Sequence, residues 1–129
     1  MGVERGRVLL IMLAAVVALT LGETALAKGA KQAARAGGEW AAQSLAIVRN
    51  GWVAAGIALL GVHLALYLLA LRRADLSFAL PLTAASYPLS ALLARYYLRE
   101  DVGTARWIGT LLIAAGVAIV ALGDTAPDR

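Results

Sequence analysis

Four stretches of the chain are almost free of charged side chains and have about the length needed to cross a lipid bilayer. One span needs about 20 mostly apolar residues, because a helix rises about 1.5 Å per residue through about 30 Å of hydrocarbon. The first stretch reaches that length only if it continues past Glu23 to about Ala27, which brings a carboxylate into the span. The pattern therefore predicts four transmembrane helices, at about 7–27, 52–71, 76–98 and 105–123.

The start of the chain permits a second interpretation. Met1–Arg7 is basic, residues 8–22 are apolar, and Ala25-Leu26-Ala27 resembles a cleavage pattern, which together are typical of a secretory signal peptide. We favour a retained first span, because the apolar core is long for a signal peptide and alanines occur throughout the chain.

The connections between the predicted spans are short except the first. Within it, residues 39–50 place Trp40, Leu45 and Val48 near one helical face, which indicates a short helix in the membrane interface. The alternative is a solvated loop that packs on the membrane surface. In either case we expect a single membrane domain over residues 1–129.

Composition agrees with an all-α integral membrane protein: 61% of the 129 residues are hydrophobic, 16% are charged, and the mean hydropathy is +0.77. The absence of cysteine excludes disulfides, cysteine-ligated zinc and iron–sulfur clusters, and a single histidine argues against a metal site, so no cofactor is expected. The net charge of +4 comes from Lys and Arg at the ends of apolar runs, where lipid headgroups rather than nucleic acid explain them. Without a phosphate loop, a catalytic triad or paired carboxylates, an enzyme is not expected.

The distribution of Lys and Arg hardly distinguishes the two sides of the membrane. With both termini on one side, that side has the basic residues Arg5, Arg7, Arg72, Arg73 and Arg129. The other side has Lys28, Lys31, Arg35, Arg49, Arg99 and Arg106, with Arg95 close by. We expect both termini on the cytoplasmic side, although so even a distribution also permits dual topology and an antiparallel dimer.

Polar side chains inside the predicted spans are candidates for function, since each costs free energy in hydrocarbon unless it faces protein or water. Thr20 and Glu23 share a face of the first span. A partly desolvated carboxylate at Glu23 would alternate between a proton and a cation, as an exchanger requires, whereas an interfacial one would pair with Lys28. On the second span His63 and Tyr67 share a stripe, and His63 either relays protons or donates a hydrogen bond to a neighbouring helix.

The last two predicted spans differ in kind. The third has hydroxyl side chains along one helical face, at Thr83, Ser86, Tyr87 and Ser90. Pro81 and Pro88 interrupt the same helix and predict a bend, which suits a substrate pathway or a contact between helices. The fourth has regularly spaced small residues that predict a close helix contact and favour dimerisation, at Gly109, Gly116 and Gly123.

Several motifs resemble those of known transporters. Leu69–Ser77, Ala79–Pro81, Leu98–Glu100 and Trp107–Val117 are similar to the last helices of the drug/metabolite transporter superfamily, and the glycine pattern from Gly109 resembles the dimerising fourth helix of small multidrug resistance proteins. Within the superfamily the chain most resembles the four-helix EamA-like group, in particular the subunits of aminoarabinose-phospho-undecaprenol flippases. In small multidrug resistance proteins a glutamate lies eight residues before the lysine that ends the first helix. The corresponding position before Lys28 is Thr20 in this chain, and Glu23 lies about one turn later.

The resemblance implies an alternating-access transporter of paired four-helix halves in the bacterial inner membrane, as a homodimer or with a similar four-helix chain. As a subunit of a flippase for a lipid-linked sugar, or as a small-metabolite transporter, it would hold a lipid phosphate through the basic residues Lys28, Arg72, Arg73 and Arg95. The hydroxyl and imidazole groups of the second and third spans would contact the headgroup. Two alternatives remain open: a proton-coupled exporter of small cations centred on Glu23, and a non-transporting membrane scaffold subunit that binds partners through its fourth helix.

Overall fold

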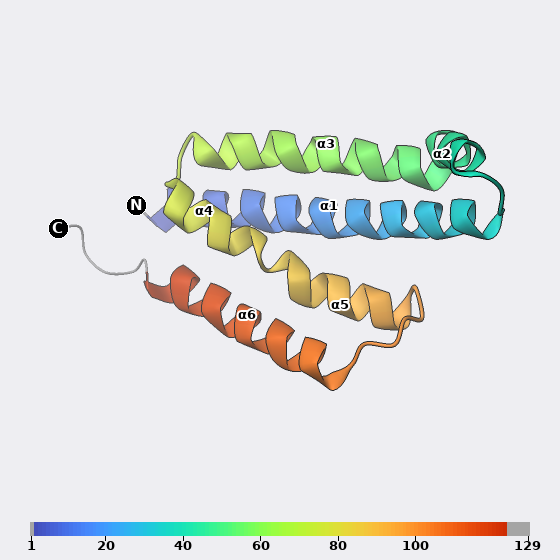
Figure 1. The fold of residues 1–129 in the computed structure, drawn as a ribbon. Helices are drawn as coiled ribbons and strands as arrows, with labels where there is room; N and C mark the ends of the chain where they lie inside the picture. The colour runs from blue at the N-terminus through green and yellow to red at the C-terminus, as the bar shows by residue number, and fades with distance from the viewer. Residues whose placement is uncertain (1, 124–129) are drawn as a thin grey trace.

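The computed structural model describes residues 2–123 and is all-helical over that range (Figure 1). Arg129, counted above with the N-terminal side, lies outside the described residues, as does Met1. Within residues 2–123 the helices are α1 Gly2–Arg35, α2 Trp40–Val48, α3 Gly51–Leu71, α4 Leu76–Thr83, α5 Ser86–Tyr96 and α6 Thr104–Gly123.

Among these residues, four segments are long and apolar enough to cross a membrane: α1, α3, the α4–α5 pair over Leu76–Tyr96, and α6. The predicted all-α fold with four candidate spans is confirmed. Helix α1 continues beyond the predicted first span through residues 28–35, which are rich in Ala, Lys, Gln and Arg and therefore favour helix. It ends before Gly37 and Gly38, whose φ angles of 70° and 104° suit glycine and no longer suit an α-helix.

Helices α1 and α3 run antiparallel and pack against each other along their length (Figure 1). The buried face of α1 contains small residues at helical spacing, namely Ala15, Ala18, Gly22, Ala25, Gly29 and Ala33. Gly22 faces Gly56 of α3, and a Cβ atom added to Gly56 would lie 2.8 Å from the carbonyl oxygen of Gly22. The two backbones therefore approach this closely only because both residues lack a side chain.

The third span is broken into α4 and α5 at Ala84 and Ala85. There the amide groups of Ala84, Ala85 and Tyr87 donate to carbonyl groups three residues earlier, rather than four as in an α-helix. Pro88 has no amide hydrogen to donate to the carbonyl of Ala84, and its ring crowds that carbonyl. Pro81 and Pro88 predicted a bend in the third span, and the structure has a full break between two helices there.

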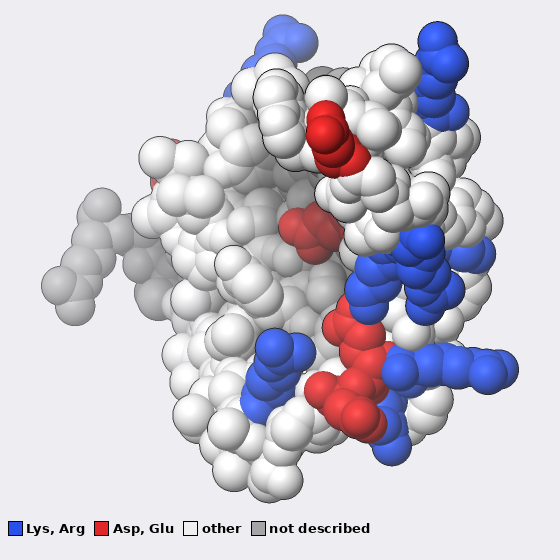
Figure 2. All heavy atoms as spheres, turned by 45° about the vertical axis from the view of Figure 1, so that its right-hand side comes forward, with Lys and Arg blue, Asp and Glu red and all other residues white. Residues whose placement is uncertain are grey.

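The apolar core lies at the end of the bundle that holds the start of α1. Its buried residues come from α1, α3 and α4 and are Val8, Met12, Ala70, Ala79 and Leu82. Helix α6 adds the partly buried Val117 and Ala121, and none of its described residues is fully buried. From this end α5 and α6 diverge from the α1–α3 pair (Figure 1), and one face of the molecule is hollowed (Figure 2). Apolar packing therefore joins α4 and α6 to the α1–α3 pair at this end, whereas polar contacts join α5 to α1 toward the other end.

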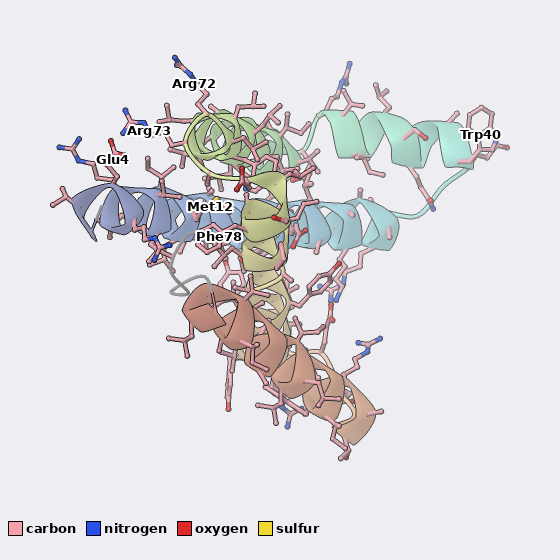
Figure 3. The ribbon with its side chains drawn as sticks, turned by 90° about the vertical axis from the view of Figure 1, so that its left-hand side faces the viewer. Glu4, Met12, Trp40, Arg72, Arg73 and Phe78 are labelled. Atoms are coloured by element: carbon pink, nitrogen blue, oxygen red, sulfur yellow. The ribbon has the colours of Figure 1, made fainter. Side chains whose placement is uncertain are left out.

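Helix α2 lies crosswise to α3. Figure 1 views α2 nearly along its axis, whereas Figure 3 shows it from the side with α3 nearly end-on. None of its residues is buried, and Trp40, Leu45 and Val48 are exposed, Trp40 by 81%. A helix that runs across the direction of the spans with exposed apolar side chains has the geometry of an interfacial helix. Its place in the membrane interface stays a prediction.

Candidate functional site

Three polar pairs join α1 to α5 and to the residues that follow α5. They are Glu23–Ser90, Lys28–Tyr97 and Lys31–Glu100, and we call them the polar seam. Along α1 and α5 the residue numbers of the partners rise together, because the two helices run in parallel. The pairs therefore form a strip along the contact between the helices rather than a single cluster.

Glu23 is the acidic member of the polar seam on α1. Its carboxylate is exposed, and Ser90 Oγ donates a hydrogen bond to its Oε2 at 3.2 Å. Among the described residues Glu23 forms no ion pair with Lys28, which was one of the two interpretations of its sequence position. An exposed carboxylate at this contact is accessible to a cationic group that enters from outside the protomer.

Lys28 is enclosed by two aromatic rings. Its Nζ lies 3.8 Å from the ring centroid of Trp52 and 4.9 Å from that of Tyr97, both within the range of about 6 Å for a cation–π interaction. Trp52 is held at the start of α3 by Asn50, whose Oδ1 accepts from the Trp52 amide at 2.9 Å and whose Nδ2 donates to Gln32 at 3.1 Å. Trp52 is thereby part of the α1–α3 unit, whereas Tyr97 follows α5.

The hydroxyl stripe predicted for the third span is divided by the break between α4 and α5. Thr83 Oγ1 donates to the carbonyl of Leu80 in its own helix at 2.6 Å, and Ser86 is buried. Tyr87 is exposed and, with Ser90, lines a cavity of about 390 Å³ between α5 and α6. Because the break changes the helical register, only Ser90 of the four takes part in the polar seam.

Thr20 and His63 are both tied to the backbone of α1. Thr20 is buried, and its hydroxyl donates to the carbonyl of Val16 at 2.9 Å. His63 Nδ1 lies 2.8 Å from the carbonyl oxygen of Ala15, and since a carbonyl only accepts, the imidazole donates this bond from α3 to α1. Tyr67 stacks on His63 with 5.9 Å between ring centroids. This geometry is that of a histidine that holds two helices together.

We expect His63→Leu to lower the free energy of unfolding by about 1 kcal/mol, because it removes one hydrogen bond between helices. His63→Gln keeps a donor and is expected to lose less. Thermal unfolding in detergent, followed by circular dichroism, measures both variants. Equal losses in the two would show that the hydrogen bond contributes nothing beyond packing.

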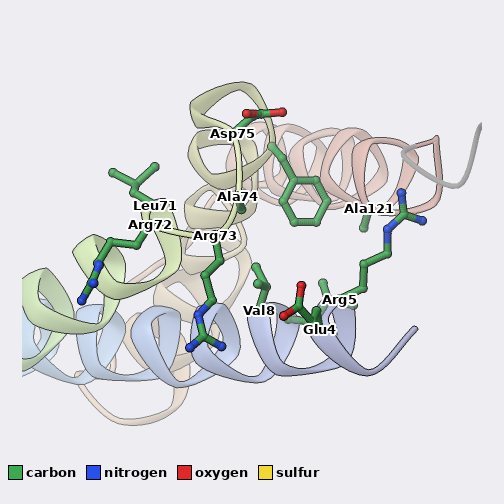
Figure 4. Close-up of a pocket in the computed structure, with 11 residues that line it drawn as sticks. Glu4, Arg5, Val8, Leu71, Arg72, Arg73, Ala74, Asp75 and Ala121 are labelled. Carbon is green, nitrogen blue, oxygen red and sulfur yellow. The ribbon is translucent and has the colours of Figure 1, made fainter. Parts of the chain in front are cut away.

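A second candidate site lies at the opposite end of the bundle, in a cavity of about 500 Å³ between the start of α1, the α3–α4 connection and the end of α6 (Figure 4). Its apolar lining is Val8, Leu9, Leu71, Ala74, Phe78 and Ala121. Its charged residues are Glu4, Arg5, Arg72, Arg73 and Asp75, and we call it the arginine-rimmed cavity. Arg73 extends toward α1, whereas Arg72 extends away from Ala121 (Figure 4). The described residues give neither of these two guanidinium groups a hydrogen-bond or ion-pair partner.

The four residues predicted to hold a lipid phosphate do not form one cluster. Figure 3 shows Arg72 and Arg73 at one end of the bundle and Trp40 at the other. Lys28 and Arg95 belong to the end with Trp40. The 21 residues of α3 separate the two ends by about 30 Å at about 1.5 Å per residue. A phosphate group can therefore contact one basic pair or the other, but not all four side chains at once.

The glycine stripe of α6 contacts no other helix of the protomer closely. A Cβ atom added at Gly109, Gly116 or Gly123 would meet no described atom within 4 Å. The close contact between small residues within the protomer is instead that of Gly22 with Gly56. The α6 surface stays open, and its use in a dimer stays a prediction.

Sequence reasoning missed Tyr97 and Glu100 as partners of α1. Each is 69 residues from the lysine that it contacts, so no local pattern links them. It also left open which group would neutralise Arg95, which the structure pairs with Asp101 at 3.3 Å. The available signal was the tyrosine pair at the end of the third span, opposite the lysines at the end of the first.

Comparison with curated proteins finds relatives with one shared name, probable 4-amino-4-deoxy-L-arabinose-phosphoundecaprenol flippase subunit ArnE. The protein from Pseudomonas savastanoi pv. phaseolicola is 38% identical over 73 residues, which are 57% of this chain and 64% of that protein, just under two thirds of its length. The protein from Pseudomonas paraeruginosa is 37% identical over 81 residues, 63% of this chain and 67% of its own length. The protein from Pectobacterium atrosepticum is 37% identical over 73 residues, 57% of this chain and 65% of its own length. No family profile matches the chain, and no solved structure does.

Proposed function

Because the chain belongs to the ArnE family of probable 4-amino-4-deoxy-L-arabinose-phosphoundecaprenol flippase subunits, we propose that it is one subunit of a transporter that moves such a lipid-linked amino sugar across the bacterial inner membrane. The observation that carries this proposal is the arginine-rimmed cavity, where guanidinium groups border an apolar lining. A lipid with a phosphate group and a long undecaprenol chain requires both, because guanidinium binds phosphate and the chain stays in apolar surroundings.

The headgroup needs a polar path through the bilayer, since hydrocarbon opposes the passage of charged groups. The polar seam supports such a path, with Glu23, Ser90 and Lys28 along the contact between α1 and α5. With both termini in the cytoplasm, the phosphate binds first at Arg72 and Arg73. The headgroup then moves along the polar seam toward the end with Lys28, while the lipid chain remains in the bilayer.

The second half of the transporter is a copy of this chain or a similar four-helix chain, since transporters are commonly built from paired repeats. This partner packs on the open surface of α6 around Gly109, Gly116 and Gly123. The α5–α6 cavity then borders the interface, where Tyr87 contacts the sugar hydroxyl groups. Translocation moves the lipid without breaking a covalent bond, so the proposal includes no catalytic residue and no cofactor.

Binding of undecaprenyl phosphate tests the arginine-rimmed cavity. We expect Arg73→Ala to weaken binding about tenfold, because a hydrogen bond to a charged group contributes about 1.5–3 kcal/mol. Native mass spectrometry of the purified chain in lipid nanodiscs, titrated with the lipid, gives the dissociation constant.

Arg49→Ala is the matched control, because it removes the same charge from an exposed position at the other end of the bundle. It is expected to change the dissociation constant by no more than about twofold, since charges this far apart are screened. Equal losses in the two variants, or unchanged binding in Arg73→Ala, would contradict the proposal.

A proton-coupled exporter of small cations is the second candidate, favoured by the exposed Glu23 carboxylate in the polar seam. Solid-supported-membrane recordings on liposomes that contain the purified chain alone separate the candidates. Currents with small amine or guanidinium cations that vanish in Glu23→Gln support the exporter. Absence of such currents, together with undecaprenyl phosphate binding that depends on Arg73, supports the flippase subunit and excludes a scaffold without a substrate.

A further inference from the structure

We propose that Trp52 and Tyr97 form a binding box for an ammonium group, which Lys28 occupies in this conformation and from which a ligand's own ammonium group displaces it. The Lys28 Nζ lies 3.8 Å and 4.9 Å from the two ring centroids and donates a hydrogen bond to Tyr97 Oη at 2.9 Å. Two aromatic faces and an oxygen acceptor around one ammonium group are the usual elements of a cation-binding site. The box therefore already has a cationic occupant.

Lys28 is held in the box without a carboxylate partner. The ion pairs among the described residues are Lys31–Glu100 and Arg95–Asp101, so the ammonium group of Lys28 contacts aromatic faces and a hydroxyl group instead. Lysine near the end of a span ordinarily extends its charge into water, but Lys28 is half-buried. Exchange of Lys28 for another ammonium group consequently leaves no buried carboxylate without a counter-ion.

The two walls of the box belong to different parts of the protomer. Trp52 is fixed on the α1–α3 unit, where a Cβ atom added to Gly29 would lie 3.0 Å from Asn50 Oδ1 and 3.0 Å from the Val53 amide nitrogen. Tyr97 follows α5, a separate helix that polar pairs join to α1. The box is complete only when the end of α5 lies against α1, so binding of an ammonium group is coupled to contact between the two parts.

The box is accessible from outside the protomer, since Trp52 is 40% and Tyr97 49% exposed. It contains the middle pair of the polar seam, between Glu23–Ser90 and Lys31–Glu100, and accepts a primary ammonium group on a small amine or on a lipid headgroup. That the natural ligand is the lipid-linked amino sugar rests on the proposed function. That the box binds an ammonium group rests on this geometry alone. Lys28, once displaced, is available to bind the phosphate of the same headgroup.

Lys28→Met tests the exchange, because methionine keeps an unbranched apolar stem and removes the ammonium group. The parent is the chain with Trp40→Phe and Trp107→Phe, which leaves Trp52 as its sole tryptophan. We expect propylammonium to bind Lys28→Met about tenfold more tightly than the parent, because a tethered competitor acts at an effective concentration in the millimolar range. Trp52 fluorescence in nanodiscs, titrated with propylammonium, reports binding, and propanol is the uncharged probe.

Lys31→Met is the matched control, since it removes the same charge one turn away and outside the box. It is expected to leave the affinity within about twofold of the parent, because Lys31 acts through an exposed ion pair. Adding Tyr97→Leu to Lys28→Met is expected to abolish the gain. An unchanged affinity in Lys28→Met, or the same gain in Lys31→Met, overturns the box.

Circular dichroism and the melting temperature show that each variant is folded, and Lys28→Gln serves as a second variant if Lys28→Met is not. The box and the proposed function fail separately. A gain in propylammonium affinity without undecaprenyl phosphate binding supports the box and contradicts the flippase. Undecaprenyl phosphate binding without a gain in propylammonium affinity supports the flippase and contradicts the box.

Discussion

Replacing Gly56 by alanine is expected to lower the free energy of unfolding by about 2 kcal/mol, and Gly56→Leu is expected to prevent the native packing of α1 on α3. A Cβ atom at position 56 would lie 2.8 Å from the carbonyl oxygen of Gly22 and 3.0 Å from the backbone nitrogen of Leu26. Backbone atoms of a helix do not rotate away as a side chain does, so the two helices must separate. Thermal unfolding in detergent, followed by circular dichroism, measures the loss.

Gly61→Ala is the matched control on the same helix. A Cβ atom there meets no described atom within 4 Å, and alanine favours helix over glycine by about 1 kcal/mol, so this variant is expected to be at least as stable as the parent. A gain in stability from Gly56→Ala, or an equal loss from Gly61→Ala, would show that the contact of Gly22 with Gly56 does not limit the packing.

Glu23→Gln is expected to reduce transport about a hundredfold, because losing a hydrogen bond to a charged group costs about 1.5–3 kcal/mol. Under both transport functions a cationic group passes the polar seam, where Glu23 offers a carboxylate that Ser90 alone of the described side chains hydrogen-bonds. Glutamine keeps the size of the side chain and an acceptor for Ser90, so the fold is expected to be retained. The loss therefore reports the negative charge.

Ser90→Ala is the control for the hydrogen bond, because it keeps the carboxylate and removes its donor. It is expected to reduce transport by no more than about fivefold, the worth of one ordinary hydrogen bond. In proteoliposomes, a membrane-impermeant amine-reactive reagent measures the arrival of the lipid-linked amino sugar in the outer leaflet, and electrical recording measures cation flux. Parental rates of both processes in Glu23→Gln would remove Glu23 from the pathway.

The number of candidate spans was predictable because a span depends on a local quantity, the apolar character of about 20 consecutive residues. The break in the third span had a local signal too, since Pro81 and Pro88 act on carbonyl groups within one turn of themselves. The family resemblance likewise follows from motifs contiguous in the sequence, and the relatives confirm it. The helical extension of α1 to Arg35 went unpredicted, because charged residues that end a span do not end a helix.

The contacts of the candidate sites depend on the tertiary structure. Glu23 and Ser90 are 67 residues apart, and the rotation of each helix about its axis decides whether they meet, which the pattern of either helix alone does not specify. The same holds for Lys28, whose sequence position allowed an ion pair and whose neighbours are two rings brought by α3 and α5.

The small residues show most clearly what the sequence indicates and what only the tertiary structure decides. The sequence indicated glycines suited to close helix contact in the fourth span, yet the close contact within the protomer is that of Gly22 with Gly56. Glycine permits two helices to approach closely but does not specify which helix is contacted. That contact depends on how all the surrounding side chains pack. The sequence by itself determined which segments enter the membrane, through transfer free energies that add up along the chain. Only the tertiary structure decided which faces of those segments meet, because the packing between them is a property of the whole bundle.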